Sequence, residues 1–427
     1  MAVLPTEILI GDPSTEWMRL ALPLVLQEDL ATSRDTAPFF ASDGSGAYEG
    51  RATEMLRTVL ENRSGRLQLA ATITDAQTQK NERVMDAGAD SGADVIVVAN
   101  RLAKGIDPRA SDFPTKNLQA LKSFTLGAAT QDLSQRLRLL NEAVGADNNF
   151  GLAQIALIET AAQVAPQDLP ALVAAGTAHH DQFAPLERAR WNTLVARYSH
   201  APLPRQADAA AAVLKIAPNN VEALGTLGVS RFLQGNSAEG ERFLRQAIAL
   251  SPANANLQLQ LANGFIESKK FNDAITVLKP LSNSAAAVPA LATANLLQGN
   301  TKEASTIFQN LIGLLPADSP PANFLRSQWE AISARSAQPL HMPATPLTPG
   351  YSAFLGGRFE EAAQFWRKVI QQTGDTDLRA RAMLAASLNG MGRTADASGI
   401  LVMPFVPDFS DGDVAIAFNQ MRQILRL

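Results

Sequence analysis

Two prolines 34 residues apart, Pro218 and Pro252, most constrain the fold of this chain, because each of them must end a helix. Between them, apolar residues recur at helical spacing on both sides of a break near Asn236. Asn236 can cap the second helix, and Glu239 completes a pair that resembles a capping box. The stretch from Val221 to Pro252 is therefore predicted to be a hairpin of two helices that repeats along the chain.

A second copy of this pattern lies 64 residues further along the chain. The letters LQGN at 297–300 repeat those at 233–236, and Pro316 follows Pro252 at the same offset. Such agreement indicates an internal duplication of helix pairs.

The pattern resembles the tetratricopeptide repeat (TPR), in which small residues let two helices approach and large apolar residues fill the remaining space. The residues that match its consensus are Leu224, Leu227, Gly228, Gly240, Leu244, Ala247 and Pro252. An arbitrary set of helical hairpins is the alternative, but agreement of several residues at one period favours the repeat.

Helices are predicted to dominate from Lys116 onward, although the pattern is not uniform. Leu194 stands where the repeat places a small residue. Four prolines between Gln338 and Gly350 exclude a continuous helix and predict an irregular crossing or a hinge. A terminal helix over Asp413–Leu427 is expected to cover the open end of the stack.

The first hundred residues have a different pattern. Glu7–Gly11 and Ala37–Ala41 are predicted to be short buried strands, with a helix over Thr15–Thr32 between them. The clearest signal is a hairpin, in which a turn at Asn62–Gly65 leads into an alternating strand over Arg66–Ile73.

The rest of this region is less regular. Tyr48–Leu60 is predicted to be a strand, and Asp75–Lys80 to be a turn. Asp90–Ile106 fits two interpretations, because its valines favour a strand whereas its apolar spacing fits a helix capped by Asp90 or Ser91.

The succession of an ILIGD strand, a helix, short strands, the element ITDAQTQK and a closing helix resembles the TolB N-terminal and FlgO-like domains of bacterial regulators. That likeness implies a helix over Asp90–Lys104. In the family a glycine normally follows the ITDAQT element, and here Gln79 replaces it. The predicted organisation is a small α/β domain over 1–107, a linker over 108–115 and a TPR-like solenoid over 116–427, with a proline-rich segment near 338–350.

Composition excludes several classes of protein. The chain has 427 residues with 37 basic and 41 acidic side chains, so it has no electrostatic footprint for nucleic acid or for an anionic membrane. The absence of cysteine excludes disulfides, thiolate metal sites and cysteine nucleophiles. No apolar run is long enough to span a membrane, and the first residues lack the pattern of a signal peptide.

Motifs for catalysis or metal binding are not found. The adjacent His179 and His180 point in different directions on a helix, unlike metal ligands. Gly44-Ser45-Gly46 is predicted to be a plain turn. The aspartates near Gly412 lack the spacing of a calcium loop, and Glu360-Glu361 suits the first turn of a helix. We therefore expect no enzyme activity, no metal and no cofactor.

The resemblance to TPRs implies binding by the first helix of each pair, which lines the concave face of such arrays. The residues implied for partner binding are Arg188, Trp191, Asn192, Tyr198, Thr226, Phe232, Asn256, Gln260 and Asn263. Only Arg188 among them is basic, so the pattern disfavours a clamp for acidic peptide ends. Trp191 and Phe232 can instead simply pack between neighbouring repeats.

The predicted function is a non-catalytic scaffold or sensor module of bacterial signalling that binds a protein or an extended peptide. One alternative is an enzyme or small-ligand sensor with its site in the α/β domain. A second alternative, implied by the TolB and FlgO likeness, is the extracytoplasmic part of a membrane-anchored bacterial regulator, which favours a periplasmic location over a cytoplasmic one.

Overall fold

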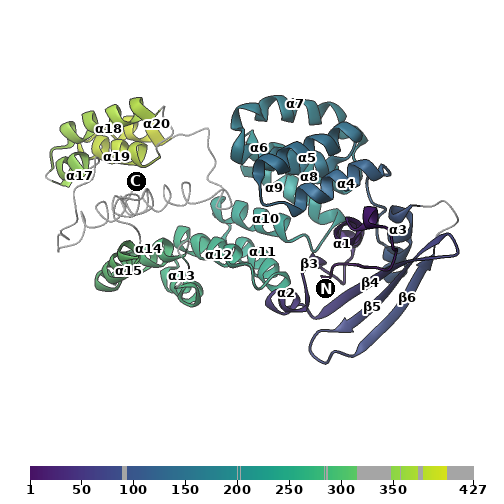
Figure 1. The fold of residues 1–427 in the computed structure, drawn as a ribbon. Helices are drawn as coiled ribbons and strands as arrows, with labels where there is room; N and C mark the ends of the chain where they lie inside the picture. The colour runs from purple at the N-terminus through teal and green to yellow at the C-terminus, as the bar shows by residue number, and fades with distance from the viewer. Residues whose placement is uncertain are drawn as a thin grey trace. The chain divides into compact units, whose positions relative to one another are not determined.

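The computed structural model describes residues 1–88, 94–199, 201, 203–282, 284, 287–314, 348–355, 357–373 and 378–401 (Figure 1). Two compact units emerge from its internal contacts. The first comprises Met1–Leu227 with Gln246–Asn254, and the second comprises Gly228–Arg245 with the described residues from Ala255 onward.

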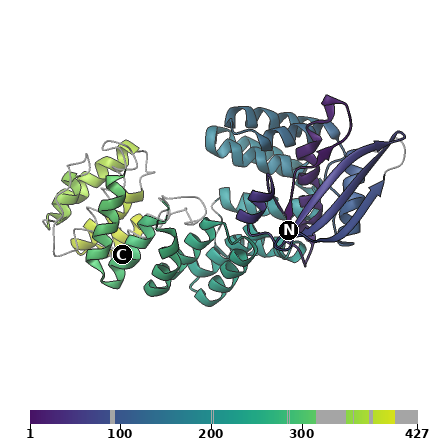
Figure 2. The ribbon, with the colours of Figure 1, turned by 60° about the horizontal axis from the view of Figure 1, so that its bottom comes forward.

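Within the part of the chain that the structure describes, six strands form one mixed sheet in the first unit (Figures 1 and 2). Their order is β3 (Phe39–Phe40), β1 (Ala2–Val3), β4 (Glu54–Arg63), β5 (Arg66–Asp75) and β6 (Asn81–Gly88), and β2 (Glu7–Ile8) also pairs with β4. Pairs among the short strands and β4 are parallel, whereas β4, β5 and β6 are antiparallel.

The predicted hairpin is confirmed between β4 and β5, where Arg63 pairs with Arg66 across a two-residue turn. Ser64 and Gly65 both have positive φ angles, 53° and 80°, as the twist of such a hairpin requires. The Asn62 side chain supports the turn, because its Oδ1 accepts a hydrogen bond from the Gly65 amide at 2.9 Å.

The turn between β5 and β6 contains Gln79 in the left-handed conformation, with φ at 57°. This conformation favours glycine, so the side chain needs compensating contacts. Gln79 Nε2 donates to the Tyr48 hydroxyl at 2.7 Å and to the Ala76 carbonyl at 2.8 Å. Gln79 therefore takes the backbone conformation of a glycine and fixes the turn with its amide.

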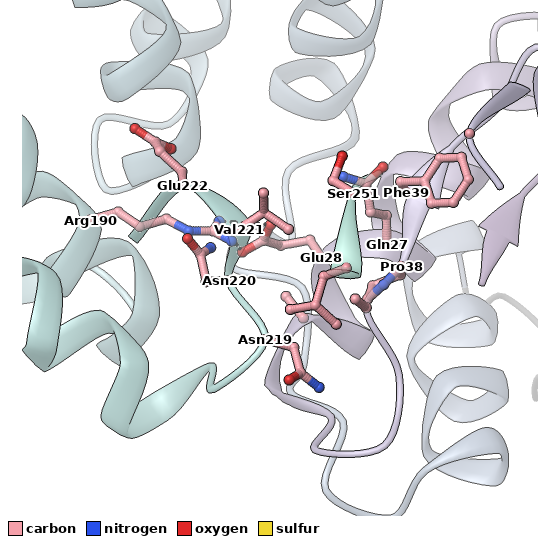
Figure 3. Close-up of a pocket in the computed structure, with 14 residues that line it drawn as sticks. Gln27, Glu28, Pro38, Phe39, Arg190, Asn219, Asn220, Val221, Glu222 and Ser251 are labelled. Atoms are coloured by element: carbon pink, nitrogen blue, oxygen red, sulfur yellow. Dashed lines mark hydrogen bonds and ion pairs between the residues drawn. The ribbon is translucent and has the colours of Figure 1, made fainter. Parts of the chain in front are cut away.

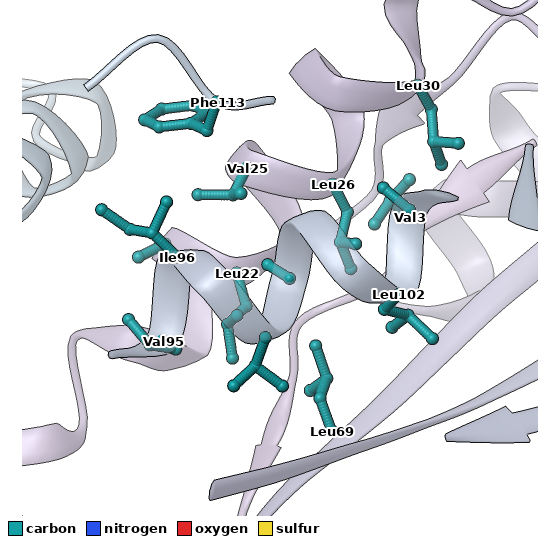
Figure 4. Close-up of a cluster of buried hydrophobic side chains, with 14 of the residues drawn as sticks. Val3, Leu22, Val25, Leu26, Leu30, Leu69, Val95, Ile96, Leu102 and Phe113 are labelled. Atoms are coloured by element: carbon teal, nitrogen blue, oxygen red, sulfur yellow. The ribbon is translucent and has the colours of Figure 1, made fainter. Parts of the chain in front are cut away.

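Two helices, α1 (Met18–Asp29) and α3 (Val95–Ile106), bury their apolar residues in one core with β5. Leu22, Leu26 and Leu102 lie in this core together with Leu69 of the sheet (Figure 4). The helix predicted over Asp90–Lys104 is thus present from Val95. Asp94 caps it, because its Oδ1 accepts from two amides of the first turn.

The prediction of a plain turn at Gly44-Ser45-Gly46 is wrong, because these residues begin a short helix, α2 (Gly44–Glu49). Asp43 Oδ1 accepts a hydrogen bond from the Gly46 amide at 2.8 Å and so caps this helix. The strand predicted from Tyr48 consequently begins later, at Glu54.

Residues 108–115, predicted to be a linker, pack against their surroundings. Ala110, Phe113 and Thr115 are all buried, and Thr115 Oγ1 donates to Asp147 Oδ2 at 2.6 Å. The ring of Phe113 meets Phe150 edge-on at a centroid distance of 5.6 Å. One apolar cluster therefore includes both the α/β elements and the first helices after them. The domain boundaries at 107 and 116 remain a prediction.

Six further helices of the first unit follow α3 along the described part of the chain. They are α4 (Leu118–Ala129), α5 (Leu133–Ala146), α6 (Gly151–Val164), α7 (Leu169–His179), α8 (Pro185–Tyr198) and α9 (Leu203–Ile216). Leu194, the large residue at a position that favours a small one, is buried in an apolar cluster with Ile158 and Trp191.

The hairpin predicted over Val221–Pro252 is confirmed as α10 (Val221–Leu233) and α11 (Ser237–Leu250). Asn236 Oδ1 accepts from the Glu239 amide at 3.4 Å, and Glu239 Oε2 accepts from the Asn236 side chain at 2.9 Å. The pair thus differs from a capping box, in which the glutamate would accept from the backbone amide of the cap residue.

Further helices of the second unit also occur in pairs. They are α12 (Ala255–Glu267), α13 (Phe271–Leu278), α14 (Val288–Gln298), α15 (Thr301–Gly313), α17 (Thr348–Leu355), α18 (Phe359–Thr373), α19 (Leu378–Gly390) and α20 (Thr394–Leu401). Gly299 follows α14 with φ at 97°, as Gly235 follows α10 with φ at 82°, so the two LQGN copies make equivalent turns. Glu360 and Glu361 occupy the first turn of α18, as predicted.

Some predictions fall outside the described residues. These are the terminal helix over Asp413–Leu427, the aspartates near Gly412 and the proline-rich segment up to Leu347. Pro349 from that segment lies in the first turn of α17, a position where proline suits a helix.

Candidate functional site: helix faces and a polar pocket

Helix α8 carries four of the residues predicted to bind a partner, and its N-terminus is fixed by a buried carboxylate. Glu187 is 1% exposed, and its two oxygens accept from the amides of Leu152 at 2.8 Å and Ala184 at 3.0 Å. Burial raises the pKa of Glu187 to about 7, although both amide hydrogen bonds oppose the shift. This carboxylate therefore joins α8 to the start of α6.

Trp191 of α8 lies in the interior rather than on a binding face. It is 1% exposed and meets Phe183 edge-on at 5.6 Å, and its ring packs directly on the backbone of Gly176. Its position therefore fits the alternative that Trp191 packs between neighbouring helices. The other predicted residues of α8 differ, because Asn192 is exposed while Arg188 and Tyr198 are half-buried.

The guanidinium group of Arg188 is hydrogen-bonded to backbone carbonyls of the turn before α8. Its Nη2 donates to the Asp181 carbonyl at 2.8 Å and to the Phe183 carbonyl at 3.1 Å. The guanidinium therefore supports the turn before α8.

Phe232 of α10 is 2% exposed and fills the space that two glycines leave open. A Cβ added at Gly240 would lie 2.5 Å from its ring, Gly264 approaches the same ring, and Phe265 meets it edge-on at 6.0 Å. Phe232 thus joins neighbouring helices by packing. Thr226, earlier on α10, is half-buried.

Helix α12 carries the remaining predicted residues, and they are not alike. Asn256 at its start is exposed, whereas Gln260 and Asn263 are each 4% exposed. The structure therefore leaves Asn192 and Asn256 as the exposed members of the predicted set, with Arg188, Tyr198 and Thr226 partly exposed. The binding role of all nine residues remains a prediction.

A pocket that sequence reasoning missed lies within the first unit and has a volume of about 300 Å³ (Figure 3). One wall comes from α1 and β3 and includes Glu28 and Phe39. The opposite wall comes from α8, the start of α10 and the end of α11, and includes Arg190, Glu222 and Ser251. Figure 3 shows Arg190 reaching toward Glu28 across this space.

The polar residues of the pocket are held in place by ion pairs. Arg190 Nη1 donates to both carboxylate oxygens of Glu28, at 2.6 and 2.8 Å, and both side chains are mostly buried. Glu222 accepts from Arg197 Nη2 at 2.8 Å. Burial alone would lower the pKa of Arg190, but the carboxylates of Glu28, Glu222 and Glu187 together more than offset this effect, with Glu28 contributing most, and raise the pKa.

Asn219 at the rim of the pocket joins the loop before α10 to the α/β elements. Its Nδ2 donates to the Arg34 carbonyl at 2.8 Å and lies within 3.5 Å of the carbonyls of Ser33 and Thr36. No sequence signal indicated this contact, because it joins residues more than 180 positions apart and follows no period.

Comparison with protein families identifies the class of the repeated helices. Residues 231–294, from the end of α10 into α14, match the family model described as the tetratricopeptide repeat. Together with the paired helices, this match confirms the predicted fold class, mainly α with TPR-like helix pairs preceded by a small α/β region. The likeness of that region to TolB N-terminal and FlgO-like domains remains a prediction.

Among solved structures, the chain is similar to the TPR domain of P58(IPK), with 15% identity over 72% of this chain and 89% of that one. The TM-score of this likeness is 0.22. A comparison with curated proteins finds no match.

Two further observations concern chemistry and membranes. Among the residues that the structure describes, no group of three or more His, Cys, Asp or Glu side chains is placed to hold a metal ion. Within the same ranges, no helix combines the length and the apolar character needed to cross a bilayer.

Proposed function

We propose that this chain is a non-catalytic scaffold that binds a protein or an extended peptide through the first helices of its repeats. The TPR match at residues 231–294 carries the proposal, because such repeats generally mediate contacts between proteins. The exposed amides of Asn192 on α8 and Asn256 on α12 support it, since amides can pair with the backbone of an extended segment.

The proposal assigns different roles to the nine residues. Asn192, Asn256, Arg188, Tyr198 and Thr226 are the proposed contacts, because they are at least partly exposed. Trp191, Phe232, Gln260 and Asn263 are proposed to act by holding the helices that carry those contacts, since all four are buried.

A library of random linear peptides, selected against the full chain, tests this proposal. Selected peptides should bind at least tenfold more weakly to Asn192→Arg or to Asn256→Arg, because a long cation would replace a small amide. Gln246→Arg, an equally exposed change on α11, is the matched control and should bind normally. Failure to select any peptide, or binding that neither variant weakens, would overturn the proposal.

The alternative of a bacterial regulator's extracytoplasmic part rests on the TolB and FlgO likeness alone. A fusion to a reporter enzyme that is active only outside the cytoplasm tests this alternative. The fusion is expressed in the native host with the native upstream sequence. An inactive reporter would exclude this alternative and leave the scaffold proposal intact.

A further inference from the structure

The pocket in the first unit has a volume of about 300 Å³, which is the size of a site for one small molecule. All of the residues that line it belong to the first unit, and all except the exposed Glu222 are half-buried. The pocket is therefore a feature of one compact body. It is separate from the exposed amides on α8 and α12, which the proposed scaffold role uses.

The charges around the pocket are already balanced by ion pairs. Both oxygens of Glu28 accept from Arg190 Nη1, at 2.6 and 2.8 Å. Glu222 accepts from Arg197 Nη2 at 2.8 Å. A cation would have to compete with an arginine for either glutamate, and an anion would have to compete with Glu28 for Arg190. The pocket therefore disfavours a charged ligand of either sign.

The same ion pairs can still bind a neutral hydroxyl group. Each carboxylate oxygen of Glu28 has a second lone pair, and Arg190 uses only Nη1 for its bond to Glu28. Because a hydroxyl group both donates and accepts, it can add to the two members of the pair without separating them. A hydrogen bond to an ionised group is also stronger than one between neutral groups.

Neutral polar side chains add further hydrogen-bonding groups to the lining, and they are Gln27, Asn219, Asn220 and Ser251. Among the residues that the structure describes, the Gln27 amide and the Ser251 hydroxyl make no hydrogen bond to the protein. Asn219 donates through Nδ2 to backbone carbonyls, and Asn220 Oδ1 accepts from a backbone amide, so each keeps its other amide atom for a ligand. Figure 3 shows Gln27 and Ser251 at one end of the pocket and Arg190 at the other, so a ligand needs polar groups on more than one side to reach both.

The apolar part of the wall suits the C–H groups of a small ring. Phe39, Val221 and Leu250 line the pocket together with the polar groups. The Phe39 ring packs on the backbone of Gly50, where an added Cβ would lie 2.6 Å from it, so the ring is fixed in position. Aromatic faces carry partial negative charge and attract polarised C–H groups. A ring that carries several hydroxyls therefore matches both kinds of wall.

We propose that this pocket binds one neutral sugar ring. Its hydroxyls pair with Gln27, Ser251 and the ion pair of Glu28, while its C–H groups pack on Phe39 and Val221. A free monosaccharide and the terminal residue of a glycan both carry such a ring. The proposal is independent of the peptide-binding role proposed for α8 and α12.

Saturation-transfer NMR of the full chain, titrated with glucose, galactose and mannose, tests the proposal. Each sugar is compared with its uronate and with its amino sugar at about pH 6, where both added groups are charged. The three compounds of each set share a ring and differ in charge. At least one neutral sugar should bind, and about fivefold more tightly than either charged counterpart, because the counterparts must compete with an ion pair.

Methyl glycosides of the sugar that binds distinguish the two sources. A glycoside that binds at least as tightly as the free sugar assigns the pocket to the end of a glycan, because the methyl group stands where the chain would continue. Weaker binding of both anomeric glycosides assigns the pocket to a free monosaccharide. Either result upholds the proposal.

Variants locate the binding in the pocket. Gln27→Leu removes an amide at nearly constant size and should weaken binding about fivefold, the effect of one hydrogen bond between neutral groups. Ser251→Leu should abolish binding by filling the space. Gln167→Leu, the same change at an exposed position of the first unit outside the pocket, is the control and should bind normally.

Circular dichroism of each variant establishes that it is folded. If Ser251→Leu unfolds, Gln27→Leu still decides the outcome, because the Gln27 amide makes no hydrogen bond within the described part of the chain. Three results would each overturn the proposal. These are no binding of any neutral sugar, equal or tighter binding of a uronate or an amino sugar, and binding that the folded variants at Gln27 and Ser251 leave unchanged.

Discussion

The two compact units hold their helices together in different ways. In the second unit, glycines let helices approach until backbone meets side chain, as at Gly240, where an added Cβ would lie 2.9 Å from the Gly228 carbonyl. In the first unit, buried polar side chains join segments far apart in sequence, as Glu187 does for the starts of α6 and α8. The repeats thus rely on small residues at their helix contacts. The first unit also has such a contact at Gly176, and it adds buried hydrogen bonds between segments that no repeat relates.

The difference explains why the repeats of the second unit can be recognised from sequence. Small residues recur at the helix contacts with the period of the repeat, because alanines stand 34 residues after Gly228 and Gly240. Residues 231–294 in this region match a family model. A buried polar contact occurs once and leaves no periodic trace.

Replacing a contact glycine should have the largest effect in either unit. Gly240→Val would place its side chain against Phe232 and the Gly228 carbonyl, and Gly176→Val would meet the Trp191 ring. We expect each to lower the free energy of unfolding by about 3 kcal/mol, because neither the backbone nor the buried rings can move away without strain. Chemical denaturation measures the loss.

Gly399→Ala is the control for both variants. An added Cβ at Gly399 in α20 meets nothing within 4 Å, so the change should stabilise the helix by about 0.5 kcal/mol. If Gly240→Val were as well tolerated as Gly399→Ala, the close approach of helices at glycine would not be what stabilises the second unit.

Glu187→Ala should destabilise the first unit by about 3 kcal/mol, because it leaves the amides of Leu152 and Ala184 without their acceptor. Glu187→Gln keeps one acceptor oxygen and should lose about half as much. Differential scanning calorimetry of the full chain measures both changes. Equal melting temperatures for the two variants would contradict a hydrogen-bonding role for this carboxylate.

Asp29 should make stability depend on pH. It is fully buried at the end of α1, and neither carboxyl oxygen has a hydrogen-bond partner among the described residues. Burial, with a smaller contribution from Glu28, raises its pKa to about 9 from an ordinary 3.8. Above the ordinary value the folded state therefore keeps a proton that the unfolded chain has released.

Because the pKa of Asp29 is higher in the folded than in the unfolded chain, stability falls as the pH rises. The contribution of Asp29 to stability is complete below about pH 4 and is lost as the pH rises through 9. We expect the wild type to lose at least about 2 kcal/mol relative to Asp29→Asn between about pH 6 and about pH 8. Denaturation at a series of pH values measures the difference, with Asp273→Asn, an exposed residue of α13, as the control. Parallel pH profiles for wild type and Asp29→Asn would contradict a raised pKa.

The sequence was sufficient to predict the helix pairs, the β4–β5 hairpin and α3, because each leaves a local periodic or turn signal. It did not distinguish exposed amides from buried ones. Asn256 and Asn263 both belong to the face that the repeat pattern assigns to binding, yet only Asn256 is exposed. Exposure depends on tertiary packing, which the spacing of residues on one helix does not specify.

The pocket was not predictable for a related reason. Glu28 and Arg190 are 162 residues apart, and neither stands in a motif. The short α2 was missed because its two glycines suggested a turn, while the Asp43 cap that starts the helix looks the same in sequence as a turn aspartate.

Asn219→Ala should have a moderate effect. It removes the donor that joins the loop before α10 to the carbonyls of Ser33, Arg34 and Thr36. We expect a loss of about 1 kcal/mol, since Asn219 is partly exposed and water can replace part of the interaction. Hydrogen exchange should show faster exchange in the segment after α1. Unchanged exchange there would indicate that the contact does not hold the segment.

Glu241→Gln should have the smallest effect, and it sharpens the contrast between the units. Glu241 pairs with Arg245 at 2.8 Å and lies 3.6 Å from Lys270, but all three side chains are considerably exposed. Water and salt screen such pairs, so we expect a loss below about 0.5 kcal/mol that disappears in high salt. Denaturation of wild type and variant at low and high salt measures it. A loss as large as that of Glu187→Ala would contradict this expectation. Exposed ion pairs would then stabilise the second unit as strongly as buried polar groups stabilise the first.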